Sequence, residues 1–160
     1  MTGSNVCCFT GHRTVKADFD EKKFDSILRK LIGKGVDTFI CGGALGFDML
    51  AEKKILALKK EFSQIKLHIY APCQNQAERW TLLQKMSYNK ILNKADYVDM
   101  PPRPYFDGCM KIRNFKMVDN SAYCVAYYDG TFASGTGQTV RYAMKKGIKV
   151  INILEESDFE

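Results

Sequence analysis

The sequence predicts an α/β protein with a three-layer, Rossmann-like fold built on a doubly wound, mainly parallel sheet. Short apolar runs alternate with longer amphipathic segments along the chain, and no change in composition marks a linker. The apolar runs are hydrophobic on both faces, which is typical of strands covered by helices on two sides. Strands joined by helices favour parallel pairing through right-handed crossovers. We expect a single domain over residues 1–160.

Each predicted strand is a short apolar run bounded by glycine, proline or polar residues. The strands are expected at residues 5–10, 36–41, 65–71, 96–100, 122–128 and 148–154. Each predicted helix has apolar residues at helical spacing, as Phe24, Leu28 and Leu31 show in the first one. The helices are expected at residues 20–33, 45–62, 75–93, 110–121 and 135–146.

Length, composition and charge are those of an ordinary globular protein. The chain has 160 residues, of which 46% are hydrophobic and 26% are charged. No apolar segment approaches the ~20 residues that span a bilayer, and the N-terminus lacks a basic region followed by an apolar one. We therefore expect a cytoplasmic protein without membrane contact. The net charge of +6 fits phosphate-bearing partners but does not identify a nucleic-acid binder.

The cysteines and histidines do not predict a metal site. No two of the six cysteines form a CxxC pair, and four lie within or at the end of predicted strands, so we expect buried, reduced thiols. The two histidines lack metal-like spacing. The chain also contains no GxxxxGK[ST], GxGxxG or GxSxG motif, which argues against a P-loop, NAD chemistry and a nucleophile elbow. No cofactor is expected, and no catalytic residue is assigned.

The most informative stretch is the turn Gly42-Gly43-Ala44-Leu45-Gly46-Phe47-Asp48, between a predicted strand and a predicted helix. Glycines let the backbone approach a bound group, and the helix start presents free N–H donors with positive dipole potential. This arrangement suits a phosphate or another anion. The alternative is that the glycines only permit close strand–helix packing and that Asp48 caps the first helical turn.

Polar residues gather where other predicted strands end. Doubly wound sheets bind ligands outside the carboxyl ends of the strands, where the strand order reverses. Glycine, serine and threonine at such an edge make a phosphate nest, and arginine binds phosphate with two hydrogen bonds. Arg113 and Asn114 either contact ribose and phosphate or pin their helix to its neighbours. The predicted ligand-binding residues are Gly11, His12, Arg13, Gly42, Gly43, Gly46, Asp48, Arg79, Arg113, Asn114, Asp129, Ser134, Gly135, Thr136, Gly137 and Thr139.

Three blocks together resemble the SLOG superfamily, the Rossmann-like fold shared by DNA-processing protein A (Smf) and the LONELY GUY phosphoribohydrolases. The blocks are residues 10–13, the turn at 42–48, and the Arg113-Asn114 helix leading to residues 134–139. The similarity is greatest to the small, single-domain YpsA-like branch. The resemblance implies a protein that binds a nucleotide, a nucleotide-sugar or an ADP-ribose-like molecule as a sensor or in processing.

One position departs from the LONELY GUY pattern Pro-Gly-Gly-x-Gly-Thr-x-x-Glu. Residues 134–139 stand in its first six places, and Tyr142 then occupies the place of the glutamate. Cleavage of an N-glycosidic bond needs a carboxylate. Three alternatives follow: binding without cleavage, N-glycosidic hydrolysis with Asp48, Asp119 or Asp129, and Smf-type binding of single-stranded DNA by a homodimer.

Overall fold

The computed structural model describes residues 4–156 and has the predicted alternation of strands and helices. The strands are β1 (Val6–Gly11), β2 (Thr38–Cys41), β3 (Lys66–Tyr70), β4 (Tyr97–Asp99), β5 (Tyr123–Tyr127) and β6 (Lys149–Asn152). The helices are α1 (Glu21–Gly33), α2 (Phe47–Leu58), α3 (Leu82–Lys94), α4 (Cys109–Asp119) and α5 (Gly135–Lys145). The predicted type and order of these elements are confirmed.

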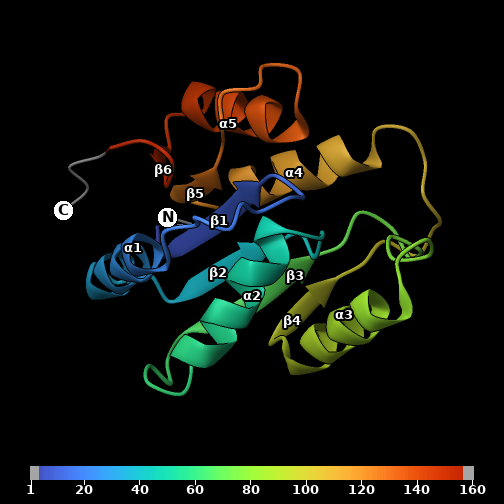
Figure 1. Ribbon diagram of the computed structural model, residues 1–160, viewed down its shortest axis with the longest axis horizontal. Coiled ribbons are helices and arrows are strands. Elements are labelled where there is room, and N and C mark those ends of the chain that lie inside the picture. The colour runs from blue at the N-terminus through green and yellow to red at the C-terminus, as the bar shows by residue number, and fades with distance from the viewer. Residues whose placement is uncertain (1–3, 157–160) are drawn as a thin grey trace.

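The sheet is parallel throughout, with the strand order β4-β3-β2-β1-β5-β6 (Figure 1). The central strand β1 pairs with β2, where Val6 lies opposite Thr38, and with β5, where Cys7 lies opposite Tyr123. The chain adds strands on one side of β1 as far as β4 and then crosses to the other side. The strand order therefore reverses between β1 and β5, and their carboxyl ends form the crevice in which such folds bind ligands.

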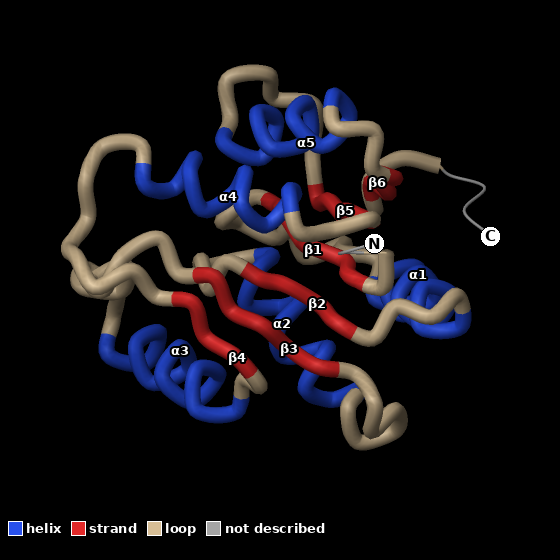
Figure 2. Tube along the Cα trace, turned by 180° about the vertical axis from the view of Figure 1, so that it is seen from behind, coloured by secondary structure: helices blue, strands red, loops and turns tan. Residues whose placement is uncertain are grey.

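Two packed cores lie on the two faces of the sheet. Successive side chains of a strand point to opposite faces, so Phe9 joins the core beneath α1 and α2, whereas Cys8 joins the core beneath α4 and α5. The first core is rich in aromatic rings, and Phe9 contacts Phe24 and Phe47 edge-on. Figure 2, seen from behind, shows α4 and α5 on the face opposite α2. The three-layer, doubly wound architecture predicted from the sequence is confirmed.

The third helix begins later than predicted. It was expected from residue 75, but α3 starts at Leu82, and the preceding residues form turns. Thr81 and Gln84 form a capping box, in which the Thr81 hydroxyl accepts from the Gln84 N–H and the Gln84 side chain accepts from the Thr81 N–H. Trp80 therefore lies in a loop before the helix, not on a helix face.

The cysteines are buried and unpaired, as the sequence predicted. Burial raises the pKa of the Cys7 and Cys41 thiols well above the ordinary value, which keeps them protonated. Within residues 4–156, no group of three or more His, Cys, Asp and Glu side chains is arranged to hold a metal ion. In the same range, no helix is long and apolar enough to cross a membrane.

Candidate ligand-binding site

A cavity of about 330 Å³ lies at the carboxyl ends of β1 and β5, where the strand order reverses. Of the predicted site residues, it is lined by Gly11, His12, Arg13, Asp48, Arg113, Asn114, Ser134, Gly135 and Thr136. It is also lined by Phe9, Thr10, Ala44 and Met110. Thr10 and Ala44 belong to the sequence motifs, whereas nothing in the sequence marks Phe9 or Met110 as wall residues.

The glycines of the 42–48 turn pack against the protein itself. A Cβ atom on Gly42 would lie 2.7 Å from the Arg113 guanidinium carbon and 2.9 Å from Asp48 Oδ2. A Cβ atom on Gly43 would lie 2.9 Å from the Tyr88 ring. The three glycines of the turn, Gly42, Gly43 and Gly46, do not line the cavity. The Ala44 N–H donates to Asp48 Oδ2 at 3.3 Å, so the protein's own carboxylate occupies this turn.

Gly46 joins the first two loops of the site and cannot carry a side chain. Its φ is +83°, and a Cβ atom there would lie 2.2 Å from the carbonyl oxygen of Arg13. We expect Gly46→Ala to lower the free energy of unfolding by about 2–4 kcal/mol, because the added methyl meets backbone and the φ is unfavourable. Chemical unfolding measures the loss. Gly35→Ala, which has a similar φ but no atom within 4 Å, is the control for backbone strain alone; equal losses in the two variants would contradict the packing role.

Arg113 is a buried cation that connects several elements. Its Nη1 donates to the carbonyl oxygens of Gly42 (2.5 Å) and Tyr70 (3.1 Å), and its Nε donates to Asn114 Oδ1 (2.8 Å). The residue therefore attaches α4 to the ends of β2 and β3 while its side chain lines the cavity. Arg113 thus pins α4 to its neighbours, one of the two roles expected from the sequence; the other role, contact with ribose and phosphate, stays a prediction.

Two carboxyl groups on the first two turns of α2 are buried. Burial raises the pKa of Asp48 to about 6, although Arg113 and the amides of Ala44 and Gly42 oppose this rise. Glu52 lies one turn later, and neither of its carboxyl oxygens has a hydrogen-bond partner in the described part of the chain. Burial and the charge of Asp48 raise the pKa of Glu52 well above its ordinary value, which favours the protonated form. The sequence prediction missed Glu52.

The start of α5 presents free donors to the cavity. Ser134 caps the helix by accepting from the Gly137 N–H at 2.9 Å. Among the described residues, the amides of Gly135 and Thr136 and the Thr136 hydroxyl have no hydrogen-bond partner. A helix start with free amides is the usual place for an anion. In the 42–48 turn, by contrast, the Ala44 amide that lines the cavity already donates to Asp48.

The remaining predicted residues lie around the cavity without lining it. Thr139 donates to the Gly135 carbonyl oxygen at 2.9 Å, and a Cβ atom on Gly137 would lie 2.8 Å from the Thr131 carbonyl oxygen. Asp129 Oδ1 lies 3.0 Å from His12 Nε2, which also accepts from the Asp129 N–H. Hydrogen bonds from Thr131 lower the pKa of Asp129. Asp129 thus braces His12 across the crevice.

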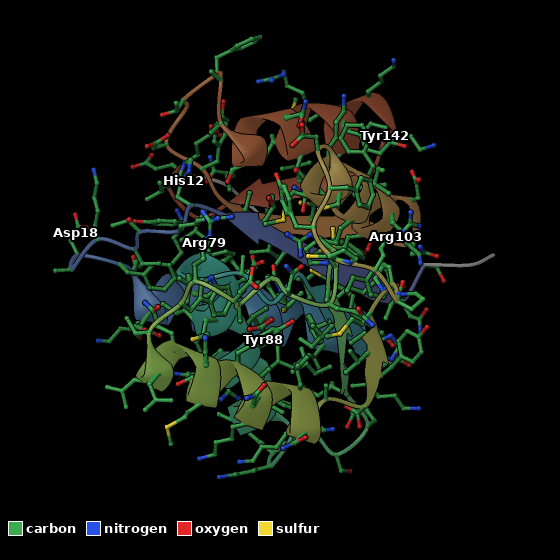
Figure 3. All side chains as sticks on the ribbon, turned by 90° about the vertical axis from the view of Figure 1, so that its right-hand side faces the viewer. His12, Asp18, Arg79, Tyr88, Arg103 and Tyr142 are labelled. Carbon is green, nitrogen blue, oxygen red and sulfur yellow. The ribbon has the colours of Figure 1, made fainter. Side chains whose placement is uncertain are left out.

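Arg79 and Tyr142 lie outside the first cavity. Arg79 lines a second cavity of about 570 Å³, which shares Arg13 and Met110 with the first. Tyr142 stacks on Phe115 at 3.8 Å and donates to Asp119 Oδ1 at 2.6 Å. Figure 3 shows Tyr142 on the far side of the molecule from His12 and Arg79. Neither Tyr142 nor Asp119 is brought to the site.

Residues 6–154 match a family model described as the YspA SLOG family. The chain belongs to this family. The SPbeta prophage-derived protein YoqJ of Bacillus subtilis is 35% identical over 136 residues, which cover 77% of this chain and 79% of YoqJ. A UPF0398 protein of Halalkalibacterium halodurans is 30% identical over 111 residues, which cover 68% of this chain and 59% of that relative. This SLOG protein thus matches less than two thirds of the UPF0398 relative.

A solved structure shows the same fold. DNA processing protein A from Helicobacter pylori, a structure described for its single-stranded DNA binding mode, aligns with a TM-score of 0.59 and 21% identity. The alignment covers 98% of this chain and 69% of that protein. At this identity the likeness shows a shared Rossmann-like fold.

Proposed function

We propose that this SLOG protein binds a nucleotide-derived small molecule and holds its phosphate at the start of α5. The proposal rests on the amides of Gly135 and Thr136, which have no hydrogen-bond partner within residues 4–156 and lie at a helix start that lines a cavity. Free helix-start amides and the helix dipole both attract an anion. The exposed Arg13 side chain adds positive charge to the same cavity.

The opposite wall is suited to a sugar. Asn114 Oδ1 accepts a hydrogen bond from Arg113 Nε. The side-chain NH₂ group of Asn114 has no hydrogen-bond partner among the described residues. Asp48 lines the same cavity. A volume of 330 Å³ is near the lower limit of small-molecule pockets, which span ~300–1,000 Å³. The cavity therefore has room for a phosphate and a sugar and little beyond them.

Calorimetric titration of the purified protein with ADP-ribose and AMP tests the proposal. We expect saturable binding of at least one of them. Mass spectrometry of small molecules released from freshly purified protein provides the complementary measurement. A ligand-free protein that gives no binding heat with either compound would contradict the proposal.

The Thr136 hydroxyl should contribute directly to phosphate binding. We expect Thr136→Val to weaken ADP-ribose binding about tenfold or more, because it removes a donor to a charged group and keeps the side-chain shape. Calorimetry measures the loss. Thr139→Val, three residues later in α5, is the matched control because that hydroxyl donates within the helix. Equal affinities in the two variants would argue against phosphate at this position.

N-glycosidic hydrolysis is a second candidate function, and the position and the pKa of Asp48 favour it. Asp48 lines the cavity, and its raised pKa of about 6 is in the range that suits a general acid or base. Asp119 and Asp129, the other carboxylates considered from the sequence, lie outside the lining. Hydrolysis would be supported if the protein released free base from nucleoside monophosphates or NAD and the Asp48→Asn variant did not. Full recovery of intact compounds after long incubation would contradict it.

Single-stranded DNA binding is a third candidate, favoured by a lysine-rich groove between α2 and α3. The groove measures about 510 Å³ and is lined by Lys53, Lys59, Lys60, Lys90 and Lys94. It lies toward the C-terminal ends of both helices, whereas the cavity described above lies at the start of α2. Contacts between lysines and phosphates release counterions, so affinity for oligothymidine should fall steeply with salt. An affinity for oligothymidine that does not change with salt concentration would argue against this candidate.

A further inference from the structure

The second cavity adjoins the first and is walled by two loops. One is the turn of residues 75–80 before α3, and the other is the loop of residues 101–108 before α4. Arg13 and Met110 line both cavities, so the two cavities are neighbours. Figure 3 faces this edge of the molecule and shows Arg79 between His12 and Tyr88.

We propose that the second cavity holds the base of the ligand. The ligand would then be a nucleoside diphosphate that carries a further sugar, with its diphosphate between Arg13 and the start of α5. This inference rests on the proposed function and adds the class of ligand to it. The first cavity is too small for a whole molecule of this class, whereas the second cavity next to it adds about 570 Å³.

Two aromatic side chains from separate loops line the second cavity. Trp80 is half-buried and meets the Tyr88 ring edge-on, with ring centroids 5.2 Å apart and an angle of 68°. Tyr105 is 53% exposed and lines the same cavity. Aromatic rings with a free face are the usual surfaces on which bases stack. Stacking accepts any base, so the cavity predicts a base without fixing which one.

Hydrogen bonds between protein groups hold the two aromatic loops together. The Tyr105 N–H donates to Asn75 Oδ1 at 2.7 Å, and the Gln74 N–H donates to the Arg103 carbonyl oxygen at 2.9 Å. The loop that carries Tyr105 is therefore fixed against the turn that carries Trp80. A site assembled in advance loses less conformational entropy when it binds.

The Gln76 side chain connects Tyr88, which contacts Trp80, to the glycine turn at residues 42–48. Gln76 Nε2 donates to the Tyr88 hydroxyl at 3.2 Å and to the Gly42 carbonyl oxygen at 3.3 Å. Arg79 is exposed and lines the second cavity together with Arg13. Two arginines in one lining suit the two negative charges of a diphosphate.

Tryptophan fluorescence tests the inference directly, because Trp80 is the only tryptophan of the chain. We expect ADP-ribose and UDP-glucose to change Trp80 emission in a saturable way, whereas ribose 5-phosphate binds by calorimetry and leaves the emission unchanged. Tyr105→Ala, at an exposed position, keeps the fluorophore and should weaken ADP-ribose binding about tenfold without weakening ribose 5-phosphate binding. Tyr97→Ala, also exposed but on β4, is the matched control and should change neither.

The outcomes separate the two proposals. If calorimetry shows ADP-ribose binding while Trp80 emission stays constant and Tyr105→Ala binds normally, the base lies elsewhere. The inference is then wrong, and the proposed function stands. If none of the compounds binds by calorimetry, the proposed function fails as well. Equal weakening of ADP-ribose and ribose 5-phosphate in Tyr105→Ala would also overturn the assignment of the base.

Discussion

Arg113→Met should lower the free energy of unfolding by about 3–5 kcal/mol, the largest loss expected of a substitution at this site. Arg113 is 7% exposed, and its guanidinium donates hydrogen bonds to the carbonyl oxygens of Gly42 and Tyr70. Methionine fills much of the space but leaves these buried carbonyls without their donor. It also removes the cation that opposes the rise in the pKa of Asp48. Unfolding in urea measures the change.

Lys111→Met is the matched control on the same helix. It removes the same charge from an exposed side chain whose Nζ lies 5.5 Å from the centre of the Phe115 ring. An exposed cation of this kind contributes about 0.5–1 kcal/mol. If Arg113→Met lost no more stability than Lys111→Met, the guanidinium would not be the tie between α4 and the ends of β2 and β3.

Asp48→Asn should change how stability depends on pH. The pKa of Asp48 is about 6 in the folded protein, against ~3.9 in an unfolded chain. Between these values the folded protein keeps a proton that the unfolded chain has released, so stability falls as pH rises from about 4 to about 6. A difference of about two pKa units corresponds to about 3 kcal/mol. Asparagine does not ionise, so the variant does not lose this stability as pH rises.

The two proteins should therefore unfold alike at pH 4, and the variant should be more stable by up to about 3 kcal/mol at pH 7. Denaturant unfolding at four pH values from 4 to 7 measures the difference. Glu52 is present in both proteins, and loss of the Asp48 charge also lowers its pKa, which widens the difference in the same direction. Parallel stability curves across this range would show that Asp48 ionises normally in the folded protein.

Periodicity and turn residues were enough to predict the fold. Apolar runs predicted the strands. The spacing of Phe24, Leu28 and Leu31 predicted α1, and these three side chains are buried in the structure. The failure at the start of α3 has a local cause. Residues 75–80 include good helix formers, so propensity extended the helix backward, whereas the Thr81–Gln84 capping box sets its true start.

The site could be predicted only in part. The glycine turn was recognised, but a sequence does not tell whether a glycine approaches a ligand or a side chain of the same protein. At Gly42 the neighbour is Arg113, which lies 71 residues later. The second cavity depends likewise on the contact between Asn75 and the backbone of Tyr105, which are 30 residues apart. Such contacts follow from tertiary packing, which no local pattern encodes.

We expect an anion to bind at the start of α5 and not in the glycine turn at residues 42–48. Amide chemical shifts measured by nuclear magnetic resonance during titration with ADP-ribose test it most directly. We expect large, saturable shifts at the Gly135 and Thr136 amides, which have no hydrogen-bond partner in the described part of the chain. The Ala44 amide, which already donates to Asp48, should shift little. Large shifts at Gly43 and Ala44, with none at Gly135 and Thr136, would contradict the account.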